Sequence, residues 1–325
     1  MAKLTVSTAS RLSPFLHGLW VAALVACLSP LAAKGAGGAS ASGPDPLAGP
    51  PDSRPVAPDL DSQVILITGS TGGLGREVAL ELAGRGAHII VHGRNEERGM
   101  EVVEEIRSEG IGSATFHPAD LASFEEVRAF GETILREYDR LDVLVNNAGI
   151  WLDAEERVLS EDGHELHFQV NYLSTFLLTR MLLPLLEASA PARIVNVASV
   201  AQTPLDFDDL SMEAGYSDSR AYAQSKLAQV LFTYDLAEEL EGTGISVNAL
   251  HPATMMDTGM VLSRGAEPRS SVDEGREAVV HLVTAPDTGS GRYFNGTQPA
   301  EANPQAYDAG ARETLRRMSA EFTGL

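Results

Sequence analysis

The feature that most constrains the fold is a short apolar run, Val64–Thr68, that leads directly into the glycine-rich segment Gly69–Gly75. The run has the length of a buried strand, and the residues after it, up to Leu82, have helical periodicity. Four glycines within seven residues allow a tight turn and a close approach of the backbone to a ligand. A strand, a glycine turn and a helix N-terminus together favour a pyrophosphate site, with a simple βα turn as the alternative.

Strand-like and helix-like patterns alternate through the rest of the chain. Alternation of this kind predicts a single α/β domain over residues 62–325: a Rossmann-like, doubly wound parallel sheet with helices on both faces. The further strands are expected at 87–92, 114–117, 141–145 and 193–197, and the principal helices at 96–108, 163–187 and 219–241.

Charge and cysteine content exclude several classes of function. With 24 basic and 45 acidic residues, the net charge of -21 argues against a nucleic-acid binder, which needs a basic surface. The one cysteine, Cys27, precedes the expected domain, so disulfides and cysteine zinc sites are not expected in it. The eight histidines have no metal-ligand spacing, and no metal is predicted.

The N-terminal part differs from the rest in composition. Residues 1–33 resemble a signal or membrane-anchor segment, because an uncharged run over residues 12–33 follows Lys3 and Arg11. The run Leu24–Cys27 also fits a lipobox, which makes an exported lipoprotein lipidated at Cys27 an alternative. A mis-assigned start site is a further alternative. Residues 34–61 are rich in Gly, Ala, Ser and Pro and are expected to form a flexible linker.

A second constellation suggests acid/base chemistry. Tyr222 and Lys226 are four residues apart in an expected helix and therefore share one face. An ammonium beside a phenol favours the phenolate, so Lys226 is expected to lower the pKa of Tyr222. Ser199 follows a strand at its carboxyl end, where it would hydrogen-bond a substrate oxygen. Asn171, polar among apolar neighbours, would position a water or a carbonyl near the lysine.

Cofactor contacts are predicted at the ends of successive strands. Arg94 follows the second strand, where an arginine suits the 2′-phosphate of NADP, with Arg76 as a second contact. Asp120 is a candidate for the adenine amine. The full set of expected cofactor-binding residues is Gly69, Ser70, Gly73, Leu74, Gly75, Arg94, Asp120, Leu121, Asn147, Ala148, Gly149, Tyr222, Lys226 and Pro252.

Taken together, these motifs resemble the short-chain dehydrogenase/reductase family over residues 63–325, and within it the retinol-dehydrogenase-like branch and its bacterial relatives. The matching positions are Thr68, Gly69, Gly73, Gly75, Asn146–Gly149, Asn171, Ser199, Tyr222 and Lys226. Ala198 stands where a second serine is usual, and Ala253 follows His251–Pro252 in place of the common glycine.

The resemblance implies hydride transfer between NADP(H), favoured over NAD(H), and an alcohol or carbonyl compound, with Tyr222 as general acid/base. Asn171, Ser199 and Lys226 complete the implied catalytic set. The alternatives are a sugar-nucleotide epimerase, whose glycine spacing Gly72 also satisfies, and a non-catalytic NADP-binding regulator.

Methionines at 255, 256 and 260 suggest an adaptable apolar pocket wall and hence an apolar small-molecule substrate. The catalytic domain is expected in the cytoplasm, with a membrane tether through residues 12–33 left open. Homo-oligomerisation through the helices at 163–187 and 219–241 is expected from the family, although one chain can also cover their apolar faces itself.

Overall fold

The computed structural model describes residues 60–325, so the N-terminal segment, Cys27 and nearly all of the linker lie outside the described residues. The expected linker boundary at residue 61 is slightly wrong. Leu60 is buried, and its backbone N–H donates to the carbonyl of Arg85. Leu60 and Asp61 therefore belong to the folded part.

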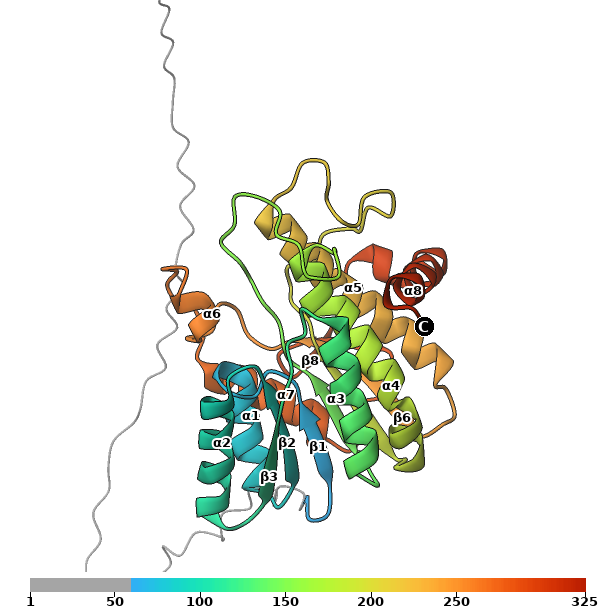
Figure 1. The fold of residues 1–325 in the computed structure, drawn as a ribbon. Coiled ribbons are helices and arrows are strands. Elements are labelled where there is room, and N and C mark those ends of the chain that lie inside the picture. Colours follow the sequence, from blue (N-terminus) through green and yellow to red (C-terminus); the bar gives the residue numbers. More distant parts are fainter. Residues whose placement is uncertain (1–59) are drawn as a thin grey trace, which may run out of the picture. The chain divides into compact units, whose positions relative to one another are not determined.

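The described residues form one eight-stranded sheet with the order β3-β2-β1-β4-β5-β6-β7-β8 (Figure 1). All neighbouring strands are parallel except the last pair, β7 and β8. The order reverses between β1 and β4, and ligands of such sheets bind outside the strand ends at this point. The strands are β1 (Val64–Ile67), β2 (His88–Gly93), β3 (Ser113–Pro118), β4 (Val143–Asn146), β5 (Ala192–Val197), β6 (Ile245–His251), β7 (Arg292–Asn295) and β8 (Gln298–Ala300).

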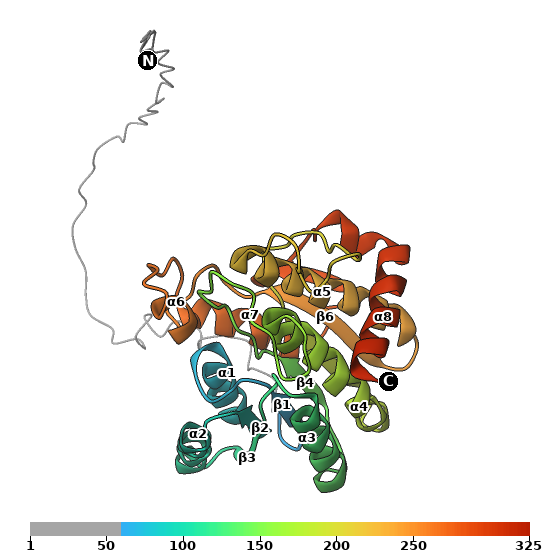
Figure 2. The same ribbon diagram turned by 45° about the horizontal axis from the view of Figure 1, so that its top comes forward.

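Helices cover both faces of the sheet, which confirms the predicted doubly wound fold (Figure 2). Successive residues of a strand point to opposite faces, so Leu66 of β1 packs into one core while Ile65 and Ile67 pack into the other. The first core also contains α3, α4, α5 and α8, and the second contains α1, α2 and α7. The helices are α1 (Gly73–Ala83), α2 (Glu96–Glu109), α3 (Phe124–Glu137), α4 (Ser174–Ala188), α5 (Asp218–Glu239), α6 (Gly259–Leu262), α7 (Val272–Thr284) and α8 (Ala309–Thr323).

The helix expected at 163–187 is wrong at its beginning. Gly163 has a positive φ of 84° in a turn, and a π-helical segment, η1 (Phe168–Leu173), precedes α4. The π turn accommodates an extra residue, and such turns are frequent at functional sites. Asn171 lies within it.

The C-terminal helix α8 packs along α5 and η1 (Figure 1). The Tyr172 and Ser319 hydroxyl oxygens are 2.6 Å apart, and Arg316 pairs with Asp235 at 2.8 Å. Part of the α5 surface that was a candidate for homo-oligomerisation is therefore covered within the chain. Among residues 60–325, no helix combines the length and the apolar character that crossing a membrane requires.

Candidate active site

The glycine turn between β1 and α1 is folded tightly against the end of β4. Gly69 has a φ of 67°, and a Cβ atom there would lie 2.9 Å from the Ala148 Cα. A Cβ atom on Gly75 would lie 2.5 Å from both the Gly69 carbonyl oxygen and the Asn147 Nδ2. Only residues without a side chain allow this geometry.

Asn147 and Thr68 lock this turn to the loop after β4. The Asn147 amide donates to the carbonyls of Thr68 and Gly69, at 2.8 and 3.2 Å. The Thr68 hydroxyl accepts from the backbone N–H groups of Asn147 and Ala148, each at 3.0 Å. The segment Asn146–Gly149 thus fixes the shape of the turn.

The N-terminus of α1 suits a pyrophosphate. Within the described part of the chain, no side chain caps this helix, and its first turn contains no acidic residue. A Cβ atom on Gly72 would have no described atom within 4 Å, so space lies beside the turn. Exposed N–H groups and the helix dipole favour an anion at such a position, and the residues present therefore fit a dinucleotide.

Two of the residues expected to contact the cofactor are engaged elsewhere. The Ser70 hydroxyl donates to the Ile67 carbonyl at 2.7 Å and accepts from the His92 backbone N–H at 3.1 Å, so Ser70 stabilises the turn itself. Arg76 forms ion pairs with Glu77 and Glu105, so its guanidinium is already neutralised by carboxylates.

Arg94 and Asp120 lie side by side at the ends of β2 and β3. Their charged groups are 3.5 Å apart, and the Arg94 side chain is 67% exposed. Asp120 also accepts from the Ala122 backbone N–H at 3.0 Å. The exposure of the Arg94 side chain leaves its guanidinium accessible to a ligand phosphate.

Three other expected cofactor contacts are buried in or beside the strand-end loops. They are Leu74, Leu121 and Pro252.

Ser199 and Tyr222 meet at the carboxyl end of β5. Ser199 is 7% exposed, and its Oγ accepts from the Ala201 backbone N–H at 3.1 Å. Burial raises the pKa of Tyr222, and the nearby Ser199 side chain lowers it by less. The Tyr293 hydroxyl donates to the Ser199 carbonyl at 3.0 Å and so holds the serine backbone. The expected fall in the pKa of Tyr222 is therefore wrong for this structure, because desolvation dominates.

Lys226 lies one turn further along α5 and is almost completely buried. Its Nζ donates to the Val197 carbonyl and to the Gln229 side-chain oxygen, each at 2.9 Å. It lies 5.9 Å from the centroid of the Tyr222 ring. Burial lowers the pKa of Lys226 to about 7.

Asn171 joins α5, at the residue before Lys226, to the loop after β4. Its Oδ1 accepts from the Ile150 N–H at 2.7 Å, and its Nδ2 donates to the Ile150 carbonyl at 3.1 Å and to the Ser225 hydroxyl at 2.9 Å. A Cβ atom on Gly149 would lie 3.3 Å from both the Asn171 Oδ1 and the Lys226 Nζ. These residues therefore converge beside the glycine turn.

The buried lysine predicts a pH dependence of stability. Its pKa falls from 10.5 to about 7 on folding, so above about pH 7 the unfolded chain binds more protons here than the folded chain does. The free energy of unfolding of the wild-type protein should therefore rise relative to that of Lys226→Met between about pH 7 and about pH 9. Urea denaturation of both proteins measures it. If the free energy of unfolding depends on pH in the same way in both proteins over this range, the lowered pKa of Lys226 is contradicted.

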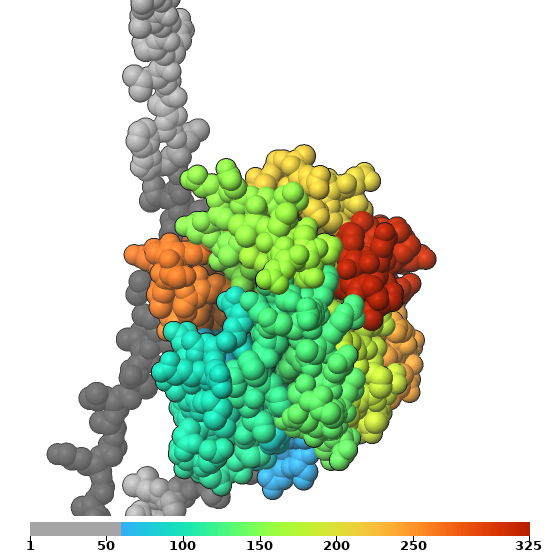
Figure 3. Space-filling model, in the orientation of Figure 1, coloured from blue at the N-terminus to red at the C-terminus, as the bar shows by residue number. Residues whose placement is uncertain are grey.

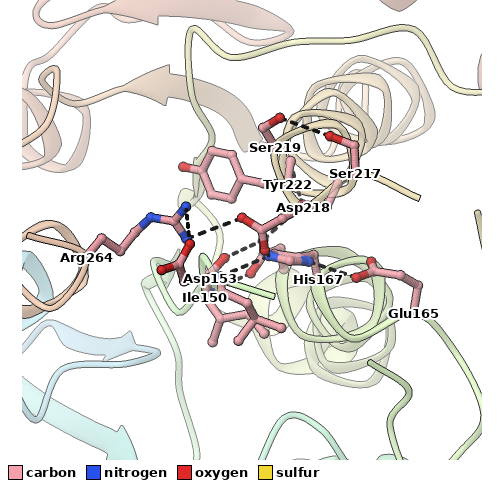
Figure 4. Close-up of polar contacts among 12 residues, drawn as sticks. Ile150, Asp153, Glu165, His167, Ser217, Asp218, Ser219, Tyr222 and Arg264 are labelled. Carbon is pink, nitrogen blue, oxygen red and sulfur yellow. Dashed lines mark hydrogen bonds and ion pairs between the residues drawn. The ribbon is translucent and has the colours of Figure 1, made fainter. Parts of the chain in front are cut away.

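The sequence interpretation missed a group of side chains around the Tyr222 ring (Figure 4). Trp151 stacks on this ring with a centroid distance of 5.3 Å, and the edge of His167 faces it at 6.4 Å. His167 pairs with Glu165 at 2.8 Å, and Arg264 pairs with Asp218 at 3.3 Å. The one signal in the sequence was the density of ionisable residues near Asn171, which says nothing about Arg264.

Over residues 60–325, no three His, Cys, Asp or Glu side chains are grouped so that they could hold a metal ion.

Comparison with known proteins gives a consistent assignment. The model of the short chain dehydrogenase family matches residues 63–268. Human retinol dehydrogenase 14 is 37% identical over 296 residues, which cover 82% of this chain and 88% of that protein. Human retinol dehydrogenase 13 is 36% identical over 291 residues, covering 83% of this chain and 87% of that protein.

Solved structures agree with the fold. An uncharacterized protein from Mycobacterium paratuberculosis superimposes with a TM-score of 0.69 at 29% identity, covering 83% of this chain and 96% of that one. The Pseudomonas aeruginosa RhlG/NADP complex gives a TM-score of 0.60 at 28% identity, covering 73% and 95%. The protein therefore belongs to the short-chain dehydrogenase/reductase family, in its retinol-dehydrogenase-like branch, and is an oxidoreductase of CH–OH groups with a nicotinamide cofactor.

Proposed function

We propose that the protein interconverts an alcohol and a ketone or aldehyde with NADP(H), and that Tyr222 is the general acid/base. The observation that carries this proposal is the convergence of Ser199, Tyr222, Lys226 and Asn171 beside the glycine turn. Chain segments far apart in sequence bring one phenol, one aliphatic hydroxyl and one lysine amine to the same strand ends.

Each side chain has a separate task in carbonyl reduction. The nicotinamide, when bound, supplies the hydride. Tyr222 donates its proton to the substrate oxygen, and its raised pKa keeps the phenol protonated at neutral pH, as a donor must be. Ser199 holds the same oxygen by a hydrogen bond. Lys226 would bind the nicotinamide ribose.

Asn171 maintains the geometry of this group. Its side chain binds both backbone groups of Ile150, so the loop after β4 stays in contact with the π-helical segment. In our proposal it also holds a water that returns a proton towards the lysine. Its burial and its three hydrogen bonds support this role, because such an amide keeps a fixed orientation.

The preference for NADP(H) rests on Arg94. The guanidinium is exposed at the end of β2, and residues at this strand end contact the adenosine ribose of a bound dinucleotide in such folds. A 2′-phosphate would pair with it by charge-assisted hydrogen bonds. The RhlG/NADP complex and an Escherichia coli short chain dehydrogenase complexed with NADPH, 28% identical with a TM-score of 0.61, support this choice of cofactor.

Replacing Arg94 with alanine should lower kcat/KM for NADPH by about ten- to one-hundredfold and leave that for NADH nearly unchanged. Steady-state kinetics with both cofactors measures the change. Arg98→Ala is the matched control, because Arg98 is exposed on the first turn of α2. An equal loss with both cofactors would show that Arg94 does not read the 2′-phosphate.

For the substrate, we propose an apolar alcohol or carbonyl compound. The names of the retinol dehydrogenases that are 36–37% identical to the aligned part of the chain support this class. The segment after β6, with Met255, Met256 and Met260, supplies flexible apolar side chains near the glycine turn.

Absorbance of NADPH in the presence of a panel of aldehydes and ketones tests the function as a whole. Consumption of NADPH supports the proposed reductase. Tightly retained NAD without net consumption of cofactor would indicate an epimerase. Binding of NADPH without turnover would indicate a regulator.

We further propose that the catalytic domain acts in the cytoplasm, because NADP(H) is scarce outside the cell. The segment 12–33 and Cys27, on which a membrane tether or a lipid anchor depends, lie outside the described residues. Cell fractionation, with a Cys27→Ala variant as a control for lipidation, tests this location.

A further inference from the structure

The loop that follows Gly149 is anchored on either side of Trp151 by the segment 165–171. Ile150 is bound by Asn171 through both of its backbone groups. The Leu152 N–H donates to the Nε2 of His167 at 3.1 Å, and the Nδ1 of this fully buried histidine faces Glu165. These bonds fix the backbone on either side of the intervening residue, and the orientation of its side chain depends on the contacts that its ring makes.

That intervening side chain is Trp151, which contacts two partners. Its ring stacks on the Tyr222 ring at a centroid distance of 5.3 Å and an interplanar angle of 28°. The guanidinium carbon of Arg264 lies 4.0 Å from the centroid of the Trp151 ring, within the range of a cation–π contact. Trp151 thus links Arg264 to the proposed proton donor.

Arg264 ties together three segments that meet at this point. It follows α6 in the segment after β6, whose surface lies beside that of the loop after β4 in Figure 3. Its guanidinium lies 3.3 Å from Asp218 and 3.5 Å from Asp153 (Figure 4). Asp218 is the first residue of α5, one turn before Tyr222, and Asp153 belongs to the same loop as Trp151.

The burial of Arg264 and Asp218 indicates a fixed ion pair, whereas the Asp153 side chain is 83% exposed. The Arg264 and Asp218 side chains are 17% and 13% exposed, whereas an ordinary surface ion pair is largely solvated. The planar guanidinium can stack on an indole while it donates to two carboxylates in different directions, which a lysine ammonium cannot do.

We propose that Arg264 is a positioning residue for the reaction, which holds the Trp151 indole against the Tyr222 ring and so forms a fixed wall where the substrate approaches the Tyr222 hydroxyl. The catalytic half of this proposal rests on the proposed function. Loss of Arg264 leaves Tyr222 and Ser199 in place and frees Trp151 to leave the stack.

Tryptophan fluorescence tests the structural half directly. Trp20 and Trp151 are the two tryptophans of the chain, so a Trp20→Phe background reports on Trp151 alone. In that background, Arg264→Ala should make the emission more accessible to quenching by acrylamide and shift it to longer wavelength. Arg264→Lys should give an intermediate result. Arg269→Ala, exposed in the same segment, should change neither quantity.

Kinetics tests whether Arg264 acts through Trp151. Arg264→Ala should lower kcat/KM for a carbonyl substrate by about tenfold. In a Trp151→Ala background the same replacement should change it little, because the residue that it positions is absent. Circular dichroism checks that each variant is folded. If Arg264→Ala does not fold, Arg264→Lys replaces it in both the quenching and the kinetic experiment.

The outcomes separate this proposal from the proposed function. Unchanged quenching in Arg264→Ala and Arg264→Lys, or an equal loss of kcat/KM with and without Trp151, would overturn the positioning role. If the wild-type protein reduces no carbonyl compound, the proposed function fails, and the contact between Arg264 and Trp151 is decided by the quenching alone.

Discussion

Replacing Tyr222 with phenylalanine is expected to lower kcat for carbonyl reduction by about 10²- to 10⁴-fold, because the variant has no proton to give to the substrate oxygen. Phenylalanine keeps the ring that stacks on Trp151 and removes only the hydroxyl. The dissociation constant for NADPH should stay nearly the same. Stopped-flow oxidation of NADPH measures the first quantity, and quenching of protein fluorescence on titration measures the second.

A matched control comes from Tyr307 in the short helix η2 (Pro304–Tyr307), which packs against α5. Tyr307 is exposed, and its ring stacks on that of Tyr234, away from the strand ends that carry the site. Tyr307→Phe makes the same chemical change and should leave kcat as it is in the wild type. Retained turnover in Tyr222→Phe would refute the assignment of the proton donor.

The second large effect is expected on the fold itself. Gly75→Ala places a methyl group 2.5 Å from the backbone oxygen of Gly69 and 2.5 Å from the Asn147 amide nitrogen. The backbone of the turn must open, because a carbonyl oxygen cannot rotate away as a flexible side chain can. Overpacking of this kind lowers the free energy of unfolding by about 1–3 kcal/mol, and the displaced turn should also weaken NADPH binding.

Gly72→Ala provides the comparison within the same turn. A Cβ atom there meets no described atom within 4 Å, and the φ of −179° is accessible to alanine. Its free energy of unfolding should therefore match that of the wild type, as measured by urea denaturation. Equal destabilisation by both replacements would show that the glycines are not distinguished by the contacts in the structure.

Most of the fold was predictable because its signals are local. The alternation of strand and helix patterns predicted the parallel sheet, and four of the seven helices and strands expected after the glycine turn lie within one residue of the observed elements at both ends. The largest error was the beginning of the helix expected at 163–187, where a turn at Gly163 and the π-helical segment around Asn171 depend on contacts with other elements.

The individual contacts of the site were less predictable. Ser70 and Arg76 carry the right chemistry for a cofactor contact, yet their polar groups bind His92, Ile67 and two glutamates instead. Competing partners of this kind come from other segments of the chain. No local pattern reveals them.

The sequence by itself determined the class of fold, the position of the glycine turn and the spacing that places Tyr222 and Lys226 on one helical face. Only the tertiary structure decided the protonation of these two groups, since burial raises the pKa of Tyr222 and lowers that of Lys226. It also brought Arg264 to Trp151. The physical reason is that desolvation and ion pairing depend on which distant segments exclude water from a group, and periodicity along a chain carries no information about that.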